Sequence, residues 1–349
     1  KREMIEAIRP RYLKANRAGK KQILDEFIAT TGYHRKYAIR VLKHVPKPKG
    51  VNKPGRRKIY QGAVVDELEK IWEIYGRICS KRLHPFLPEG VRVLERCNEL
   101  HLSPEVKQLL LSMSRATIDR CLKKARFTPS QHGLSTTKPG SLLKKAIPIR
   151  TFTPWEDEHP GFLEIDLVAH CGPSTEGIYL NTLTATDLAT GWTECLALPN
   201  KTQFAVSQAI AVLRHNLPFP LLGLDSDNGS EFINDTLYRY CLSEKITFTR
   251  SRPYQKNDQA HVEQKNWSVV RHTVGYDRLE TPEELSLLGS IYADVRLYIN
   301  FFQPVLKLVA KERVDGKTIH TYDQAKTPFR RVLELVSLPV EIKARLTDQ

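Results

Sequence analysis

The pattern of apolar and polar residues divides the chain into a helical first part and a second part in which short strands alternate with helices. Up to residue 126, apolar residues recur at spacings of three and four, the period of amphipathic helices. From residue 162 onward, short apolar runs are bounded by Gly, Asn and Asp, the residues that favour turns between strands. The pattern therefore predicts all-α units followed by an α/β domain.

The first helical unit is predicted over residues 1–44. Three apolar stripes predict three short helices, and Gly32 breaks the chain before the third, as in a helix-turn-helix. The third helix is basic, and recognition helices of this motif place such side chains in the major groove. The predicted DNA contacts are Arg35, Lys36 and Arg40. The alternative is a solvated helix of an ordinary basic bundle.

Residues 45–60 combine prolines, glycines and basic side chains, a composition that predicts a semi-extended basic linker. Such a linker either follows DNA phosphates or acts only as a hinge. Its candidate DNA contacts are Arg56, Arg57 and Lys58.

A second helical DNA-binding unit is predicted over residues 61–126. Ser103 followed by Pro104 predicts one helix start, and Ser114 predicts another. The last helix is predicted over residues 115–126, and its basic side chains are Arg115, Arg120, Lys123 and Lys124. Residues 127–160 lose this periodicity and are predicted to be a linker.

The second part predicts a mixed sheet. Residues 162–168, 178–186 and 191–198 predict three strands, and a helix over residues 202–217 leads to a further strand that ends near an Asn-Gly turn. Within the first strand, Glu164 and Asp166 share one face. An Asp in such a strand is costly unless it is bound, and hard divalent cations such as Mg²⁺ are common partners of carboxylates.

The charge is unevenly distributed. The 349 residues carry a net +15, of which residues 1–160 contribute +18 and the remainder −3. A basic half without an aromatic-rich amphipathic face indicates nucleic acid rather than a membrane surface as partner. The six cysteines form no CxxC pair, which excludes a zinc ribbon and fits free thiols in a reducing cytoplasm.

Three acids have a specific spacing. Asp227 lies in Asp-Ser-Asp-Asn-Gly-Ser-Glu-Phe, with 35 residues between it and Glu263 and sixty residues between it and Asp166. Residues 161–305 thus resemble the D,D-35-E core of retroviral integrases and bacterial insertion-sequence transposases. The resemblance implies a ribonuclease H-like core with a mixed five-stranded sheet. The first Asp would lie on the first strand, the second after the fourth strand, and the Glu on a nearby helix.

The resemblance also implies a function. Asp166, Asp227 and Glu263 would be catalytic and would hold two Mg²⁺ (or Mn²⁺) ions for DNA cleavage and strand transfer. The partners would be double-stranded DNA, as terminal inverted repeats and target, and at least one further copy of the chain, in a bacterial cytoplasm close to the nucleoid. Tyr254 and Gln259 resemble loop positions that contact DNA in integrases. The chain lacks the His/Cys zinc module of retroviral integrases, which favours the transposase branch.

Several interpretations stay open. Lys265 and Arg271 are expected to be exposed helical charges that contact either phosphates or solvent. The chain could be an inactive or domesticated transposase that only binds DNA, or a ribonuclease H-type nuclease. The C-terminal extension, residues 306–349, predicts a small hairpin around Asp315 and a helix from Thr327.

Overall fold

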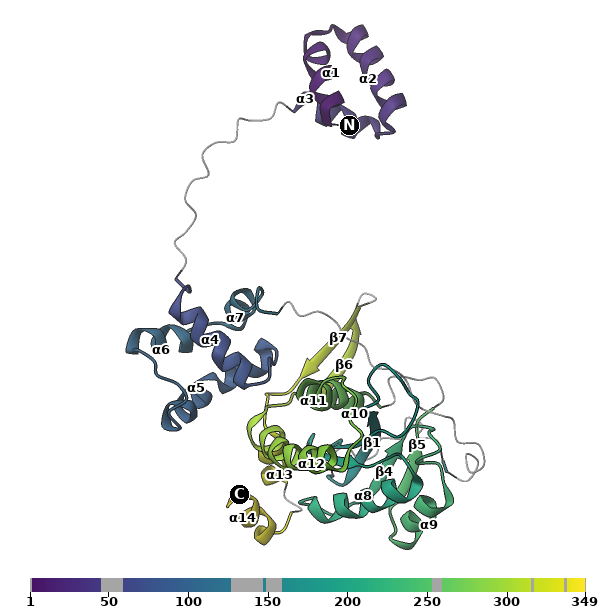
Figure 1. Cartoon of the computed structure of the whole chain (residues 1–349). Coiled ribbons are helices and arrows are strands. Elements are labelled where there is room, and N and C mark those ends of the chain that lie inside the picture. Colours follow the sequence, from purple (N-terminus) through teal and green to yellow (C-terminus); the bar gives the residue numbers. More distant parts are fainter. Residues whose placement is uncertain are drawn as a thin grey trace. The chain divides into compact units, whose positions relative to one another are not determined.

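The computed structural model describes residues 2–44, 59–126, 147–148, 159–252, 259–314, 317–335 and 338–348 (Figure 1). The chain forms two compact units, Lys1–Ile59 and Tyr60–Gln349. Among the described residues, no helix combines the length and the apolar character needed to cross a bilayer. The candidate contacts Arg56, Arg57, Lys58 and Tyr254 lie outside the described residues.

The first unit contains the three predicted helices, α1 (Arg2–Lys14), α2 (Arg17–Thr31) and α3 (Arg35–Lys43). They enclose a small core of their own, which includes Phe27 and Leu42. The α2 helix ends at Gly32, whose φ of 72° lies in the left-handed region that glycine adopts without strain. This turn gives α2 and α3 the sequence order of a helix-turn-helix.

The second unit begins with four helices, α4 (Ala63–Ile74), α5 (Ser80–Arg96), α6 (Pro104–Leu111) and α7 (Arg115–Cys121). The Ser103 and Ser114 hydroxyls accept hydrogen bonds from the first turns of α6 and α7, as predicted for helix caps. The α7 helix is shorter than predicted, because it ends at Cys121 and only turns follow it up to Arg126.

The five-stranded sheet has the order β3-β2-β1-β4-β5. Its strands are β1 (Phe162–Ala169), β2 (Asn181–Asp187), β3 (Thr193–Leu198), β4 (Gly223–Ser226) and β5 (Thr247–Arg250). The first three strands form an antiparallel meander, whereas β4 is parallel to β1 and β5 is parallel to β4. This topology confirms the predicted fold class, a mixed ribonuclease H-like sheet preceded by helices.

Helices cover both faces of the sheet. One face packs on α8 (Gln203–Asn216) and α9 (Asp235–Ser243), where Leu163 and Ile165 of β1 join the main core. The other face packs on the segments α10 (Ala260–Lys265), η2 (Asn266–Arg271), α11 (His272–Val274) and α12 (Pro282–Leu297). Because side chains alternate along a strand, the even-numbered residues of β1, including Asp166, face α10 and η2.

After α12, the short helix η3 (Tyr298–Phe302) leads to a hairpin of β6 (Leu308–Val314) and β7 (Lys317–Tyr322), and then to α13 (Pro328–Glu334) and α14 (Val340–Thr347). The predicted C-terminal hairpin and the helix capped by Thr327 are therefore present. The η3 helix also binds the end of α4. Tyr75 stacks on Phe302 at 4.4 Å between ring centroids, and the Tyr298 hydroxyl donates to the Ile74 carbonyl at 2.6 Å.

Candidate active site

Asp166 lies in the middle of β1, the central strand of the sheet, and is partly buried. Its two carboxylate oxygens have different partners. Oδ1 accepts the backbone N–H of Leu167 at 2.8 Å, and Oδ2 accepts the side-chain amide of Asn266 at 2.7 Å. Asn266 follows α10 directly, so this bond ties the central strand to the helix that carries Glu263.

Asp227 follows β4 at the point where the strand ends. Its Oδ1 accepts the backbone N–H of Gly229 at 2.8 Å, which closes a tight turn. A Cβ on Gly229 would lie 2.9 Å from that same oxygen and 2.7 Å from Glu231 Cδ, so a larger residue would force the two carboxylates to move. Asn228 stabilises the turn by donating to the Ser251 carbonyl at 2.9 Å. The Asn-Gly pair therefore fixes the direction of the Asp227 carboxylate.

Glu263 lies in the first turn of α10, with an exposed side chain. The preceding residue, Val262, is fully buried and anchors the helix against the sheet. The three predicted catalytic acids thus occupy the positions that the sequence resemblance implied: the first strand, the end of the fourth strand and a neighbouring helix.

The three acids influence one another electrostatically. Burial, and then the charge of Asp227, raises the pKa of Asp166 to about 7, and the charge of Glu263 acts in the same direction. Burial also raises the pKa of Asp227, and the hydrogen bond from Gly229 opposes that rise. Because the charges of Asp227 and Glu263 contribute to the raised pKa of Asp166, a cation placed among the three carboxylates would stabilise their charged forms.

The chemistry of these donors fits a hard divalent metal ion, because carboxylate oxygens are the ligands that Mg²⁺ prefers. The raised pKa of Asp166 is a further sign of fit, because the charges of Asp227 and Glu263 contribute to it beside burial, and a bound cation would offset those charges. Among the described residues, however, no three acidic, His or Cys side chains are gathered closely enough to hold an ion. The acids are therefore coupled electrostatically, but in this structure their side chains are not close enough together to form a complete set of metal ligands.

The sequence has a relative of nearly the same length. The uncharacterized protein y4rM of Sinorhizobium fredii is 43% identical over 332 residues, which cover 94% of each chain. The chain belongs to the y4rM family. No protein-family model matches this sequence.

Two solved structures show lower similarity to this y4rM-family chain. The catalytic core domain of BIV integrase is 19% identical with a TM-score of 0.32, and the match covers 41% of this chain and 85% of that domain. The HTLV-2 integrase catalytic core domain in complex with magnesium is 16% identical with a TM-score of 0.32, with coverage of 46% and 93%. The strand order and the helix positions, rather than these two matches, place the y4rM-family chain in its fold class.

The basic residues predicted to bind DNA are exposed wherever the structure of this y4rM-family chain describes them. On α3, Arg35 forms an ion pair with Asp25, and the guanidinium of Arg40 lies 4.9 Å from the centre of the Tyr37 ring. The basic side chains of α7 and the turn after it are all exposed: Arg115, Arg120, Lys123 and Lys124. Gln259 is buried instead, and its side-chain amide donates to the Asp225 carbonyl at 3.3 Å.

Two expectations for the helix after Glu263 are wrong. Lys265 is buried, and its pKa is lowered to about 8 by burial and by the charge of Arg82. Arg271 is partly buried and donates to the carbonyls of Ala169 and Gly275. The helix widens to π geometry over η2, which shifts the side-chain positions away from those of a regular α-helix. The charges predicted on the solvent side therefore point into the protein.

Sequence reasoning missed the two polar contacts that link β1 to the Glu263 helix. Asn266 follows Glu263 by three residues, so it lies on the same helical side, and this spacing could have indicated it. For Glu164, the sequence predicts only that it shares a strand face with Asp166. In the structure it is fully buried, and its Oε2 accepts the backbone N–H groups of His261 and Val262.

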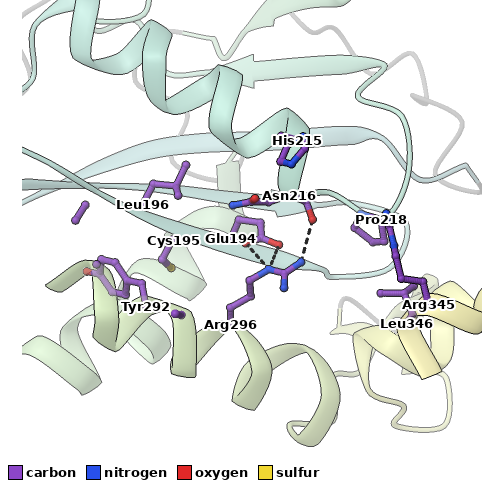
Figure 2. A pocket seen from close by; sticks show the side chains of 13 residues that line it. Glu194, Cys195, Leu196, His215, Asn216, Pro218, Tyr292, Arg296, Arg345 and Leu346 are labelled. Carbon is purple, nitrogen blue, oxygen red and sulfur yellow. Dashed lines mark hydrogen bonds and ion pairs between the residues drawn. The ribbon is translucent and has the colours of Figure 1, made fainter. Parts of the chain in front are cut away.

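A cavity of about 420 Å³ lies elsewhere in the second unit, lined by β3, the end of α8, α12 and α14 (Figure 2). Arg296 extends into it and donates from Nε to Glu194 at 2.7 Å and from Nη2 to the Asn216 carbonyl at 2.9 Å. Glu194 is almost fully buried, and its ion pair with Arg296 compensates the charges of both side chains. None of the three candidate catalytic acids lines this cavity.

Proposed function

We propose that the chain is a DDE-type transposase or integrase that binds the ends of a mobile DNA element, cleaves them and joins them to target DNA. The observation that carries the proposal is the electrostatic coupling of Asp166 with Asp227 and Glu263. These three acids come from a central strand, a neighbouring parallel strand and an adjacent helix, and they have the spacing of the D,D-35-E signature.

In this proposal Asp166, Asp227 and Glu263 hold two Mg²⁺ (or Mn²⁺) ions. Bound ions of this kind activate an attacking oxygen and stabilise the leaving oxygen of a phosphodiester. The chain supplies the orientation. Asn266 directs Oδ2 of Asp166, and Gly229 directs Oδ1 of Asp227. Fixed carboxylates lose little conformational freedom when they bind a cation or a substrate.

The exposed basic residues of α3 and α7 support DNA as the partner, because cations clustered on short helices bind phosphates. The two helical units would hold the terminal inverted repeats. Since two DNA ends have to be processed together, the working form would contain at least two copies of the chain.

The test is a cleavage and strand-transfer assay with the full chain, Mg²⁺ and a duplex that ends in the inverted repeat flanking the gene. Asp227→Asn and Glu263→Gln should each lower both reactions at least about 100-fold, because each removes a charge that stabilises the bound ions. Binding of the duplex without metal should change little. Asp235→Asn is the matched control, because this exposed carboxylate at the start of α9 pairs only with Arg239 among the described residues.

Undiminished strand transfer by Asp227→Asn would overturn the mechanism. The separation of the three acids favours one alternative function, that of a protein that binds DNA without catalysis. That rival predicts specific binding of the terminal repeat by the unmodified chain but no cleavage with Mg²⁺ or Mn²⁺. Cleavage of RNA–DNA hybrids without strand transfer would instead indicate a ribonuclease H-type nuclease.

A further inference from the structure

Glu164 is a fully buried acid in the centre of the sheet. It lies two residues before Asp166 on β1 and therefore projects from the same face of the strand. A buried carboxylate is strongly destabilising unless hydrogen bonds or charges compensate it. Its partners therefore show what it does in this fold.

Two of those partners are at the start of the Glu263 helix. Glu164 Oε2 accepts the backbone N–H of His261 at 3.0 Å and that of Val262 at 3.1 Å. The N–H groups in the first turn of a helix have no acceptor within the helix, and the positive end of the helix dipole favours a carboxylate there. Glu164 therefore caps α10 from a strand almost a hundred residues earlier in the chain.

Among the described residues, no side chain next to the start of α10 caps it in place of Glu164. The residue at its N-cap position, Gln259, makes no side-chain bond to the helix. Its amide donates instead to the Asp225 carbonyl on β4, two residues before Asp227. The start of α10 thus contacts β1, which carries Asp166, and β4, which Asp227 follows, in each case at the residue two positions before the aspartate.

A second attachment lies on the other side of Glu263, where Asn266 donates to Asp166. Glu263 is therefore bracketed by two contacts with β1, one through the backbone of residues 261–262 and one through the side chain of residue 266. These contacts determine how far the Glu263 carboxylate is from Asp166.

We propose that Glu164 is a positioning residue, which holds the first turn of α10 so that Glu263 can share a metal ion with Asp166. The proposal rests on the proposed function, because it assigns Glu263 to that site. Glu164 itself touches neither metal nor DNA in this role. If Glu164 served the fold alone, its removal would lower stability without changing how the chain responds to metal.

The test compares Glu164→Leu with Glu164→Gln in the full chain. Leucine removes the acceptor, whereas glutamine keeps an oxygen that can accept the same N–H groups. Glu164→Leu should lower kcat and raise the Mg²⁺ concentration for half-maximal cleavage by about 10- to 100-fold, the effect typical of residues that orient metal ligands. KM for DNA should stay within about twofold, and Glu164→Gln should restore most of the loss.

A second pair of variants tests the same bond from the surface, where folding is less at risk. His261→Pro removes one of the two donated N–H groups at a helical position that tolerates proline. His261→Ala keeps that N–H and loses only the exposed imidazole. His261→Pro should lower kcat about tenfold, and His261→Ala should match the unmodified chain.

Hydrogen exchange of the metal-free protein provides a readout that does not depend on activity. Peptides covering residues 259–266 should exchange faster in Glu164→Leu and His261→Pro than in Glu164→Gln or His261→Ala. If exchange, kcat and Mg²⁺ dependence are all unchanged in the first two variants, the positioning role is wrong. If the unmodified chain does not cleave DNA, the proposed function fails, and faster exchange then shows only that Glu164 anchors α10.

Discussion

At the scale of single residues, similar acids in one sheet have different environments. Asp187 is buried with its carboxylate saturated by the N–H groups of Gly161 and Thr190 and by the Thr190 hydroxyl, and it closes a turn. Glu194 pairs with Arg296. Asp166 differs from both, because its pKa is raised to about 7 partly by other carboxylates. Uncompensated negative charge, rather than burial alone, marks the candidate site.

This charge should make the metal-free protein less stable as the pH rises. The pKa of Asp166 in the folded protein, about 7, lies above its ordinary value of 3.8. The folded state therefore binds more protons than the unfolded state between about pH 4 and pH 7, and stability falls across that window. Above about pH 7, Asp166 is ionised in the folded protein and its destabilising effect is complete.

Asp227→Asn should remove part of this penalty, because it abolishes the charge that faces Asp166 and keeps the oxygen that accepts from Gly229. At pH 8 in EDTA, we expect the unfolding free energy to increase by about 1 kcal/mol. This increase should fall toward zero at about pH 4. Urea denaturation at both pH values measures it, with Asp235→Asn as the control. A loss of stability at pH 8 would contradict the repulsion between Asp166 and Asp227.

At the scale of elements, two features determine which surfaces the helices present. Lys265, at the end of α10, is buried, and Arg271, at the end of the π helix η2, donates to the Ala169 carbonyl of β1. The η3 helix fastens the end of α4, through the stacked rings of Tyr75 and Phe302 and the hydrogen bonds of Tyr298. The α4–α7 helices therefore belong to the same compact unit as the sheet.

Tyr298→Phe tests the attachment of α4. The variant keeps the ring against Phe302 but removes the hydroxyl that donates to the Ile74 carbonyl at 2.6 Å and accepts from Gln303 at 2.9 Å. We expect a loss of about 1–3 kcal/mol in unfolding free energy, because partly buried polar groups lose their partner. Tyr322→Phe, on the exposed hairpin, should change stability by less than about 0.5 kcal/mol. Equal effects of both variants would show that the Tyr298 hydroxyl is unimportant.

At the scale of the whole molecule, the excess positive charge and the candidate catalytic acids lie in different units. Residues 1–59 contain 18 Lys and Arg but 4 Asp and Glu, a net +14 of the chain's +15. The three candidate catalytic acids lie in the second unit. The first unit has a hydrophobic core of its own, so we expect it to fold without the second.

Removal of residues 1–59 should therefore weaken DNA binding without unfolding the remainder. The slope of log K against log salt should become shallower by about 0.9 for every phosphate that these residues neutralise in the full chain. Titrations of a labelled terminal-repeat duplex at several salt concentrations measure this slope, and the melting temperature of residues 60–349 is the control. An unchanged slope would place the main DNA-binding surface in the second unit.

The sequence by itself determined the class of the fold and indicated the three candidate acids, because both depend on patterns along the chain. Apolar periodicity distinguishes helices from strands, and the spacing around Asp227 and Glu263 is readable without coordinates. It also located the caps at Ser103 and Ser114, which act within one turn.

Only the tertiary structure decided how the acids are held. Glu164 meets the start of α10 across 97 residues of sequence, and Asn266 meets Asp166 across 100. Periodicity gives the face of an element on which a residue lies, but not the element that packs against that face. The same limit explains the wrong expectation for Lys265, because its burial depends on which elements pack around the end of α10.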